Sequence, residues 1–170
     1  MSSARDLSWL LLAAGLAACS PALSDGAGDG DLLDLVDRLV DARPLEKAKV
    51  ERLTGVRLVP NRAASNPYYS LWISERGAGS LEKVELREPG EGATRRGGLV
   101  VLDLDAARAG LLHHRVAERY GKEFVYEPPR AHGPPDAPAW YLYRRPWGEL
   151  RFGFRLSDGA VVAVVIDAER

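Results

Sequence analysis

The spacing of apolar residues after position 30 predicts two helices followed by strands. Over 31–42 the apolar residues recur at helical spacing on one stripe, and aspartates and an arginine occupy the other. A second helix is predicted over 44–55, with Pro44 in its first turn and Gly55 at its end. Beyond Gly55 the period changes to two, which predicts strands. These strands cover 68–75, 82–88 and 98–105.

The same order of elements returns in the second part of the chain. A helix is predicted over 105–121, with Asp105 as its N-cap and Gly121 at its end. The strands that follow cover 122–128, 139–145, 149–156 and 160–167, with turns at 146–148 and 157–159. The pattern predicts an α+β fold in which tandem helix-plus-antiparallel-sheet units form one compact domain. We place this domain at 31–170, with possible halves 31–104 and 105–170.

The N-terminal residues have the pattern of an export signal that ends at the chain's single cysteine. A short polar start with Arg5 precedes an apolar run over 7–18, which is shorter than the roughly 20 residues that span a bilayer as a helix. We therefore expect 1–18 to be a signal peptide and 19–30, which is rich in Gly, Asp and Ser, to be a flexible tether. An ordinary signal peptide with a chance cysteine and a buried N-terminal helix are the alternatives.

The letters LAAC at 16–19 resemble the lipobox of bacterial lipoproteins. The resemblance implies that Cys19 becomes the lipidated first residue of the mature chain. In that family an Asp after the cysteine implies retention at the inner membrane, and Ser20 stands there instead. We therefore expect a lipid-anchored protein on the periplasmic face of the bacterial outer membrane, with the membrane itself as one partner.

Charge and cysteine content narrow the choice of partners and of stabilising interactions. The formal net charge is −1, so the chain has no basic field for nucleic acid, and we expect no nucleic-acid partner. A single cysteine excludes a disulfide within the chain, so the fold must rely on the burial of apolar side chains.

Part of the second half resembles the beta-lactamase-inhibitory-protein-like fold, which includes small outer-membrane lipoproteins of the SmpA/OmlA type. The residues that carry the resemblance are VAERYGK at 116–122 and the strand segments 140–143, 150–154 and 160–166. The match covers 106–167, with a fainter echo over 44–104. It departs from the family in lacking a glycine-led turn before the helix, in its long proline-rich loop and in having no disulfides. The resemblance implies a non-enzymatic scaffold that binds another protein on its sheet.

Alternation in the last strands predicts a binding face. We expect the apolar residues of these strands to face the core, namely Trp140, Leu142, Leu150, Phe152, Phe154 and Leu156. The opposite face then carries Tyr141, Tyr143, Arg151 and Arg155, and Tyr68 and Trp72 are the analogous pair in the first half. Tyr, Trp and Arg are enriched at binding hot spots. The alternatives are cross-strand packing on a solvated face and a helix that covers the aromatic side chains.

The segment 127–138 holds five of the chain's eleven prolines and separates two predicted strands. A loop of this length is usually functional or disordered, and proline reduces the entropy that binding costs. Arg130 and His132 are therefore candidate contacts to a protein partner. A stiff crossover without a partner is the alternative.

Catalytic motifs are absent from the sequence. It contains no HExxH, GxSxG, CxxC or P-loop pattern, and the aspartates of the tether lack the spacing of a calcium loop. His113 falls on the apolar stripe of its helix, which favours packing. Asp103 and Asp105 resemble the paired aspartates of haloacid-dehalogenase-type phosphatases, but Ala107 replaces the threonine of that family. We expect no catalytic residue, no metal and no cofactor.

Together these expectations describe a non-catalytic periplasmic lipoprotein that acts as a protein-binding or envelope-assembly module. An inhibitor or immunity protein against a periplasmic hydrolase or toxin is the first alternative, and a small hydrolase is the second. An acidic face matched to a partner favours the inhibitor, whereas a face of tyrosines and arginines favours the scaffold.

Overall fold

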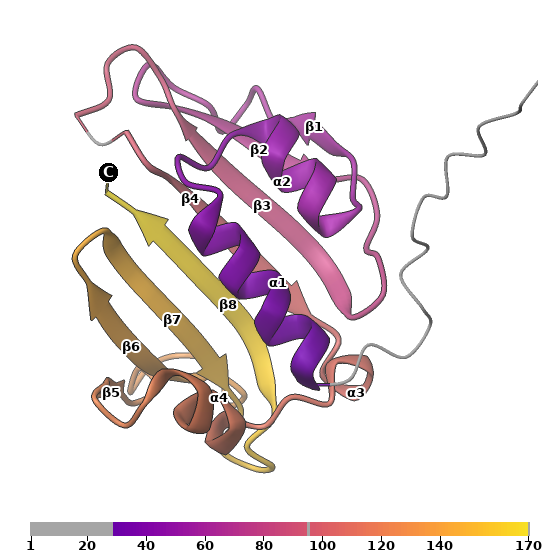
Figure 1. Cartoon of the computed structure of the whole chain (residues 1–170), viewed down its shortest axis with the longest axis vertical. Helices are drawn as coiled ribbons and strands as arrows, with labels where there is room; N and C mark the ends of the chain where they lie inside the picture. Colours follow the sequence, from indigo (N-terminus) through magenta and orange to yellow (C-terminus); the bar gives the residue numbers. More distant parts are fainter. Residues whose placement is uncertain (1–28, 95, 170) are drawn as a thin grey trace, which may run out of the picture.

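The computed structural model describes residues 29–94 and 96–169 (Figure 1). The first part contains α1 (Asp29–Asp41), α2 (Lys47–Thr54), β1 (Leu58–Pro60), β2 (Tyr69–Ser74), β3 (Leu81–Pro89) and β4 (Gly98–Leu104). The second part contains α3 (Ala106–Ala109), α4 (His113–Tyr120), β5 (Val125–Glu127), β6 (Ala139–Arg145), β7 (Gly148–Phe154) and β8 (Val161–Ala168). The described residues thus form a mixed domain in which the sheet predominates.

All eight strands belong to one antiparallel sheet. Their order is β1-β2-β3-β4-β8-β7-β6-β5, so each group of four consecutive strands forms a meander. The two meanders meet where β4 pairs with β8, with Val100 opposite Ile166 and Leu102 opposite Val164. These residues are fully buried, so the joint between the two groups lies in the middle of the hydrophobic core.

The helices lie on one face of the sheet, and α1 crosses its centre (Figure 1). On the same face, α2 contacts β3 and α4 contacts β7. The core between helices and sheet includes the fully buried Val36, Leu39, Leu86, Phe152 and Val164. Full burial of such a side chain contributes about 1.5–3 kcal/mol, so this single apolar layer can hold the domain without a disulfide.

The helix predicted over 105–121 is interrupted, which corrects the sequence prediction. Asp105 does act as an N-cap, because its carboxylate accepts hydrogen bonds from the backbone N–H groups of Ala107 and Arg108 at 3.1 and 3.3 Å. However, Gly110 adopts a left-handed conformation with φ of 60° and ends α3 after one turn. Leu111 is then fully buried, and α4 begins at His113. The predicted helix ends at Gly55 and Gly121 are confirmed.

A polar contact joins α1 of the first part to α4 of the second. The guanidinium of Arg119 lies 2.9 Å from a carboxylate oxygen of Asp34 and 2.6 Å from one of Asp37. The hydroxyl of Tyr120 donates a hydrogen bond of 2.8 Å to Asp37. The bond to Asp37 raises the pKa of Arg119. The two helix groups are therefore held together on the same face of the sheet.

Candidate functional site

One face of the sheet carries no helix among the described residues, and we call it the open face. Antiparallel pairing places Trp140 opposite Gly153 and Leu142 opposite Arg151 on this face. Tyr141 lies opposite Phe152 on the helix-covered face instead. The predicted orientation of β7 is therefore correct over 150–154, but Leu156, which was also predicted to face the core, lies beyond the end of β7 and is 62 % exposed. The predicted orientation of β6 is wrong: its Trp and Leu are on the open face, and its tyrosines face the helices.

The position of Tyr143 excludes it from a binding surface. Its side chain is 1 % exposed, and its hydroxyl donates a hydrogen bond of 3.1 Å to the backbone carbonyl of Gly121. Burial raises the pKa of Tyr143 to about 12. The alternative in which the helix layer covers the aromatic side chains thus holds for this residue.

Tyr141 belongs to an aromatic cluster beneath α4. Its ring stacks on Phe124 with 3.8 Å between centroids, and its hydroxyl lies 2.9 Å from Nδ1 of His113. His113 in turn stacks on Phe154 at 4.7 Å between centroids. Burial raises the pKa of the Tyr141 hydroxyl. The packing role predicted for His113 fits this arrangement, and Tyr141 is a packing residue as well.

In the first half, Tyr68 and Trp72 do not form one exposed pair. The indole N–H of Trp72 donates a hydrogen bond of 3.0 Å to Glu88, and the Lys47 ammonium lies 5.4 Å from its ring centroid. Trp72 thus lies next to α2 on the helix-covered side. Tyr68 is 65 % exposed and precedes β2.

Trp140 is the aromatic side chain that the open face presents in place of the tyrosines. A Cβ atom on Gly153 would lie 2.9 Å from Cη2 of this indole, so the ring rests directly on the glycine of the neighbouring strand. The missing side chain leaves room for the indole on the open face, where it is half-buried. Sequence reasoning placed Trp140 in the core. The glycine in an otherwise alternating strand was the signal for this close approach.

Residues 128–138, the proline loop, connect β5 to β6 and form a wall of a cavity against the open face. We call this space of about 610 Å³ the first cavity. The proline loop contributes Arg130 together with five of its prolines or small residues. The sheet contributes Leu99, Glu127, Trp140, Arg151, Val165 and Asp167. Two candidate contacts that were predicted from separate segments, Arg130 and Arg151, therefore line the same space.

The two arginines of the first cavity differ in how they are held. Arg151 forms hydrogen bonds to Glu149, which raise its guanidinium pKa, and it lies 3.6 Å from Glu127. Arg130 is exposed, and within the described part of the chain its guanidinium has no ion pair or hydrogen bond. His132 is also exposed but lines neither this cavity nor the next one.

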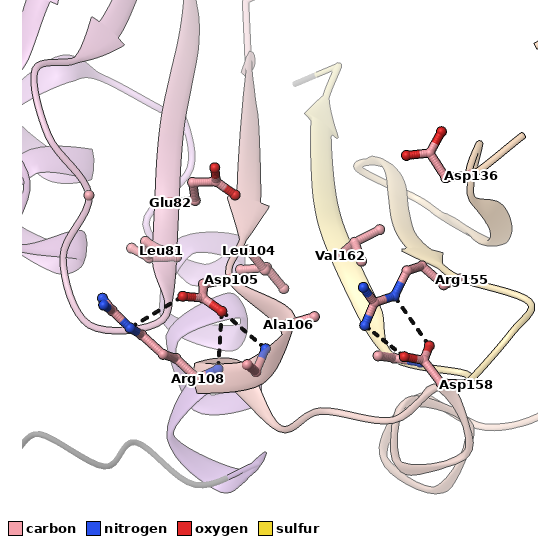
Figure 2. A pocket seen from close by; sticks show the side chains of 13 residues that line it. Leu81, Glu82, Leu104, Asp105, Ala106, Arg108, Asp136, Arg155, Asp158 and Val162 are labelled. Atoms are coloured by element: carbon pink, nitrogen blue, oxygen red, sulfur yellow. Dashed lines mark hydrogen bonds and ion pairs between the residues drawn. The ribbon is translucent and has the colours of Figure 1, made fainter. Parts of the chain in front are cut away.

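A second cavity, of about 1010 Å³, lies where the proline loop faces the start of β3 and the β7–β8 turn (Figure 2). Arg155, a predicted contact, lines it and forms an ion pair of 2.7 Å with Asp158. Two contacts lower the pKa of Asp158. The hydrogen bond from the backbone N–H of Ala160 has the larger effect, and the ion pair with Arg155 has the smaller one. Arg108 is likewise paired with the capping Asp105 at 3.2 Å.

Two carboxylates of the second cavity have no cation beside them. Glu82 and Asp136 stand on opposite sides of the space in Figure 2, one on β3 and the other on the proline loop. Over 29–94 and 96–169, neither side chain has an ion pair or hydrogen bond. With both arginines of the cavity already paired, the second cavity carries an excess of negative charge.

Comparisons with known proteins give no relative from which to transfer a role. No protein family, no curated protein and no solved structure matches the chain. Among the described residues, no group of three or more His, Cys, Asp or Glu side chains is arranged to hold a metal ion. No helix within the same residues has the length and apolar character needed to cross a membrane. Cys19, the predicted lipidation site, lies outside the described residues.

Proposed function

We propose that the protein is a non-catalytic, lipid-anchored module of the bacterial envelope that binds another protein at the open face beside the proline loop. The observation that carries this proposal is the first cavity. It gathers Trp140, Arg151 and Arg130 around an apolar floor of Leu99 and Val165. Trp and Arg are the residue types that contribute most to binding energy when they line a concave site.

The way these side chains are held also supports binding. The indole of Trp140 is fixed against Gly153, and the Arg151 guanidinium is fixed by Glu149. Side chains that are already ordered lose little entropy when a partner arrives, and prolines in the loop reduce the same cost for the backbone. A partner therefore gains contacts at a small ordering cost.

The anchor and the tandem architecture complete the proposal. The lipobox-like letters before Cys19 support a lipid anchor in the outer membrane, on its periplasmic face. Two helices followed by four strands occur in the same order in both parts of the chain, which supports two copies of one helix-plus-sheet unit. Intact mass and detergent partitioning of a Cys19→Ala variant test the anchor, because the variant should stay unlipidated and partition into the aqueous phase.

An inhibitor or immunity role is the second candidate. The excess of carboxylates in the second cavity favours it, because such proteins often match a cationic site on the enzyme that they block. This role uses the same open face, so it differs from the first in the identity of the partner.

A photo-crosslinking residue at Leu99, in the floor of the first cavity, tests the proposal in isolated envelopes. We expect one discrete crosslinked product that is lost when Trp140 is replaced by Ala. Trp147→Ala is the matched control, because Trp147 contacts Arg43 away from both cavities. A product that survives Trp140→Ala and disappears with Trp147→Ala would place the binding surface elsewhere.

A further inference from the structure

Strand β8 and the proline loop contribute residues to both cavities. Val165 and Asp167 of β8 line the first cavity, whereas Ala160 and Val162, at the start of the same strand, line the second. The proline loop contributes to both, with Arg130 in the first and Asp136 in the second. At about 3.3 Å per residue, the path from 160 to 167 is roughly 23 Å long. An extended segment of about seven residues has the same length.

Charge is distributed unevenly along this path. The lining of the first cavity includes the carboxylates of Glu127 and Asp167 as well as two arginines. Arg151 forms ion pairs with Glu149 and Glu127, and Arg130 is the charged side chain of this lining that has no partner among the described residues. At the second cavity, the arginines are paired, and Glu82 and Asp136 are the carboxylates without a cation in the described structure. One end of the path therefore favours a negative group and the other end a positive one.

The surface between the two ends is mostly apolar, with the half-buried Asp103 of β4 beside Ala163 at its middle. Val162 and Val165 of β8 lie along it, and Leu99 of β4 and Trp140 of β6 flank it at the first cavity. In an extended polypeptide every second side chain points to the same side, so several apolar side chains of one segment can rest on this floor.

We propose that the occupant is an extended polypeptide segment of about seven residues, with an acidic side chain at the Arg130 end and a lysine or arginine at the Glu82 and Asp136 end. This inference rests on the proposed function and names the chemistry of its partner. The apolar floor supplies most of the contact area. The charged ends set which segments are accepted and in which direction they lie.

Fluorescence anisotropy with purified full-length protein tests the inference. The probe is a labelled peptide Glu-Ser-Val-Ser-Val-Ser-Lys, and its matched control has Gln at both ends. Both peptides have the same net charge from their side chains, so a general field does not separate them. We expect the Glu/Lys peptide to bind roughly fivefold more tightly, as two screened ion pairs allow, and the advantage to shrink at high salt.

Substitutions of the charged residues test which end of the path binds which end of the peptide. Asp136→Asn combined with Glu82→Gln should remove the contribution of the lysine, and Arg130→Gln that of the glutamate. Glu123→Gln, an exposed carboxylate outside both cavities, is the control and should change nothing. Arg130→Glu should reverse the preference in favour of a peptide with lysine at both ends, a result that partial unfolding cannot produce.

The outcomes separate this inference from the proposed function. Equal binding of the Glu/Lys and Gln/Gln peptides, lost for both with Trp140→Ala, would overturn the charge assignment and leave the binding face intact. Failure of every peptide to bind, with the Leu99 crosslink still present, would overturn the extended segment in favour of a folded partner. Absence of the crosslink as well would remove both proposals.

Discussion

The two halves of the sheet have the same order of strands but differ in the connection between their first and second strands. In the first half, the β1–β2 connection at 61–68 closes on itself: Ser65 donates a hydrogen bond to the carbonyl of Asn61, and the Asn66 side chain accepts from the N–H of Tyr68. In the second half, the corresponding connection is the proline loop. Its backbone forms two turns within itself, and the loop lines both cavities.

The open faces of the two halves differ as well. On β3, Glu85 accepts from both Arg87 and Lys83, at 3.1 and 3.4 Å, so the charged side chains there satisfy one another. On β6 and β7 the same face carries Trp140 and Arg151. The comparison shows that one order of elements can hold two different surfaces. The surface that we propose for binding differs from its counterpart in a few side chains and one loop of the second half.

The largest effect is expected from replacing Gly153, the glycine on which the Trp140 indole rests. In Gly153→Val, the new side chain must displace Trp140, because even a Cβ atom would lie 2.9 Å from the ring. We expect a loss of unfolding free energy of about 1–3 kcal/mol and loss of the Leu99 crosslink. Chemical denaturation and the envelope crosslink measure the two effects.

The matched change in the first half is Arg87→Val on the open face of β3. It alters a half-exposed side chain, so stability should change by no more than about 0.5 kcal/mol and binding should persist. If Gly153→Val leaves both quantities unchanged, the indole does not depend on the glycine, and the distinction between the two halves weakens.

Local signals sufficed for most elements of the fold. Gly55 and Gly121 marked helix ends, and the turns at 146–148 and 157–159 followed from Pro, Gly and Asp at positions that strands avoid. The interruption at Gly110 was missed because its apolar neighbours continue a helical stripe, whereas the structure buries Leu111 in an extended segment. The three-residue β1 was too short to show a period.

The candidate site was predicted only in part, because the segment AWYLYRR has large apolar or aromatic side chains on both of its faces. Nothing within β6 decides whether Trp140 or Tyr141 faces the helices. The decision comes from Gly153 on β7, which accepts the indole, and from α4, which covers the tyrosines. Arg130 and Arg151 were each predicted, but their meeting in one cavity depends on the path of the proline loop.

A smaller effect is expected at Tyr143, which tests the corrected orientation of β6. Tyr143→Phe removes the hydrogen bond to Gly121 and should lower the unfolding free energy by about 1 kcal/mol without changing the Leu99 crosslink. Tyr126→Phe on the exposed edge strand should leave stability unchanged. Loss of the crosslink in Tyr143→Phe, with stability retained, would return Tyr143 to the binding surface.

The same variant has a defined pH dependence. Burial raises the pKa of Tyr143 from 10.0 to about 12, so above pH 10 the unfolded chain loses this proton before the folded one does. The contribution of the hydroxyl to stability is complete below pH 10 and declines as the pH rises through 12. The stability difference between the wild type and Tyr143→Phe should therefore narrow over this interval.

The smallest effects are expected from two carboxylates, one in each half, whose pKa values shift in opposite directions. Burial raises the pKa of Asp103, and the nearby Glu85 and Glu82 act in the same direction against Lys83. Ionisation of Asp103 therefore costs stability as the pH rises through its folded pKa, and Asp103→Asn should raise the melting temperature at pH 7 by on the order of 1 °C.

The N–H of Ala160 and the Arg155 guanidinium lower the pKa of Asp158, so Asp158→Asn should lower the melting temperature at pH 7. Both differences should shrink toward pH 2 as the carboxyl groups become protonated, that of Asp158 last because its pKa is lowered. Melting curves at the two pH values measure this, and a change of the same sign in both variants would contradict the opposite environments of the two groups.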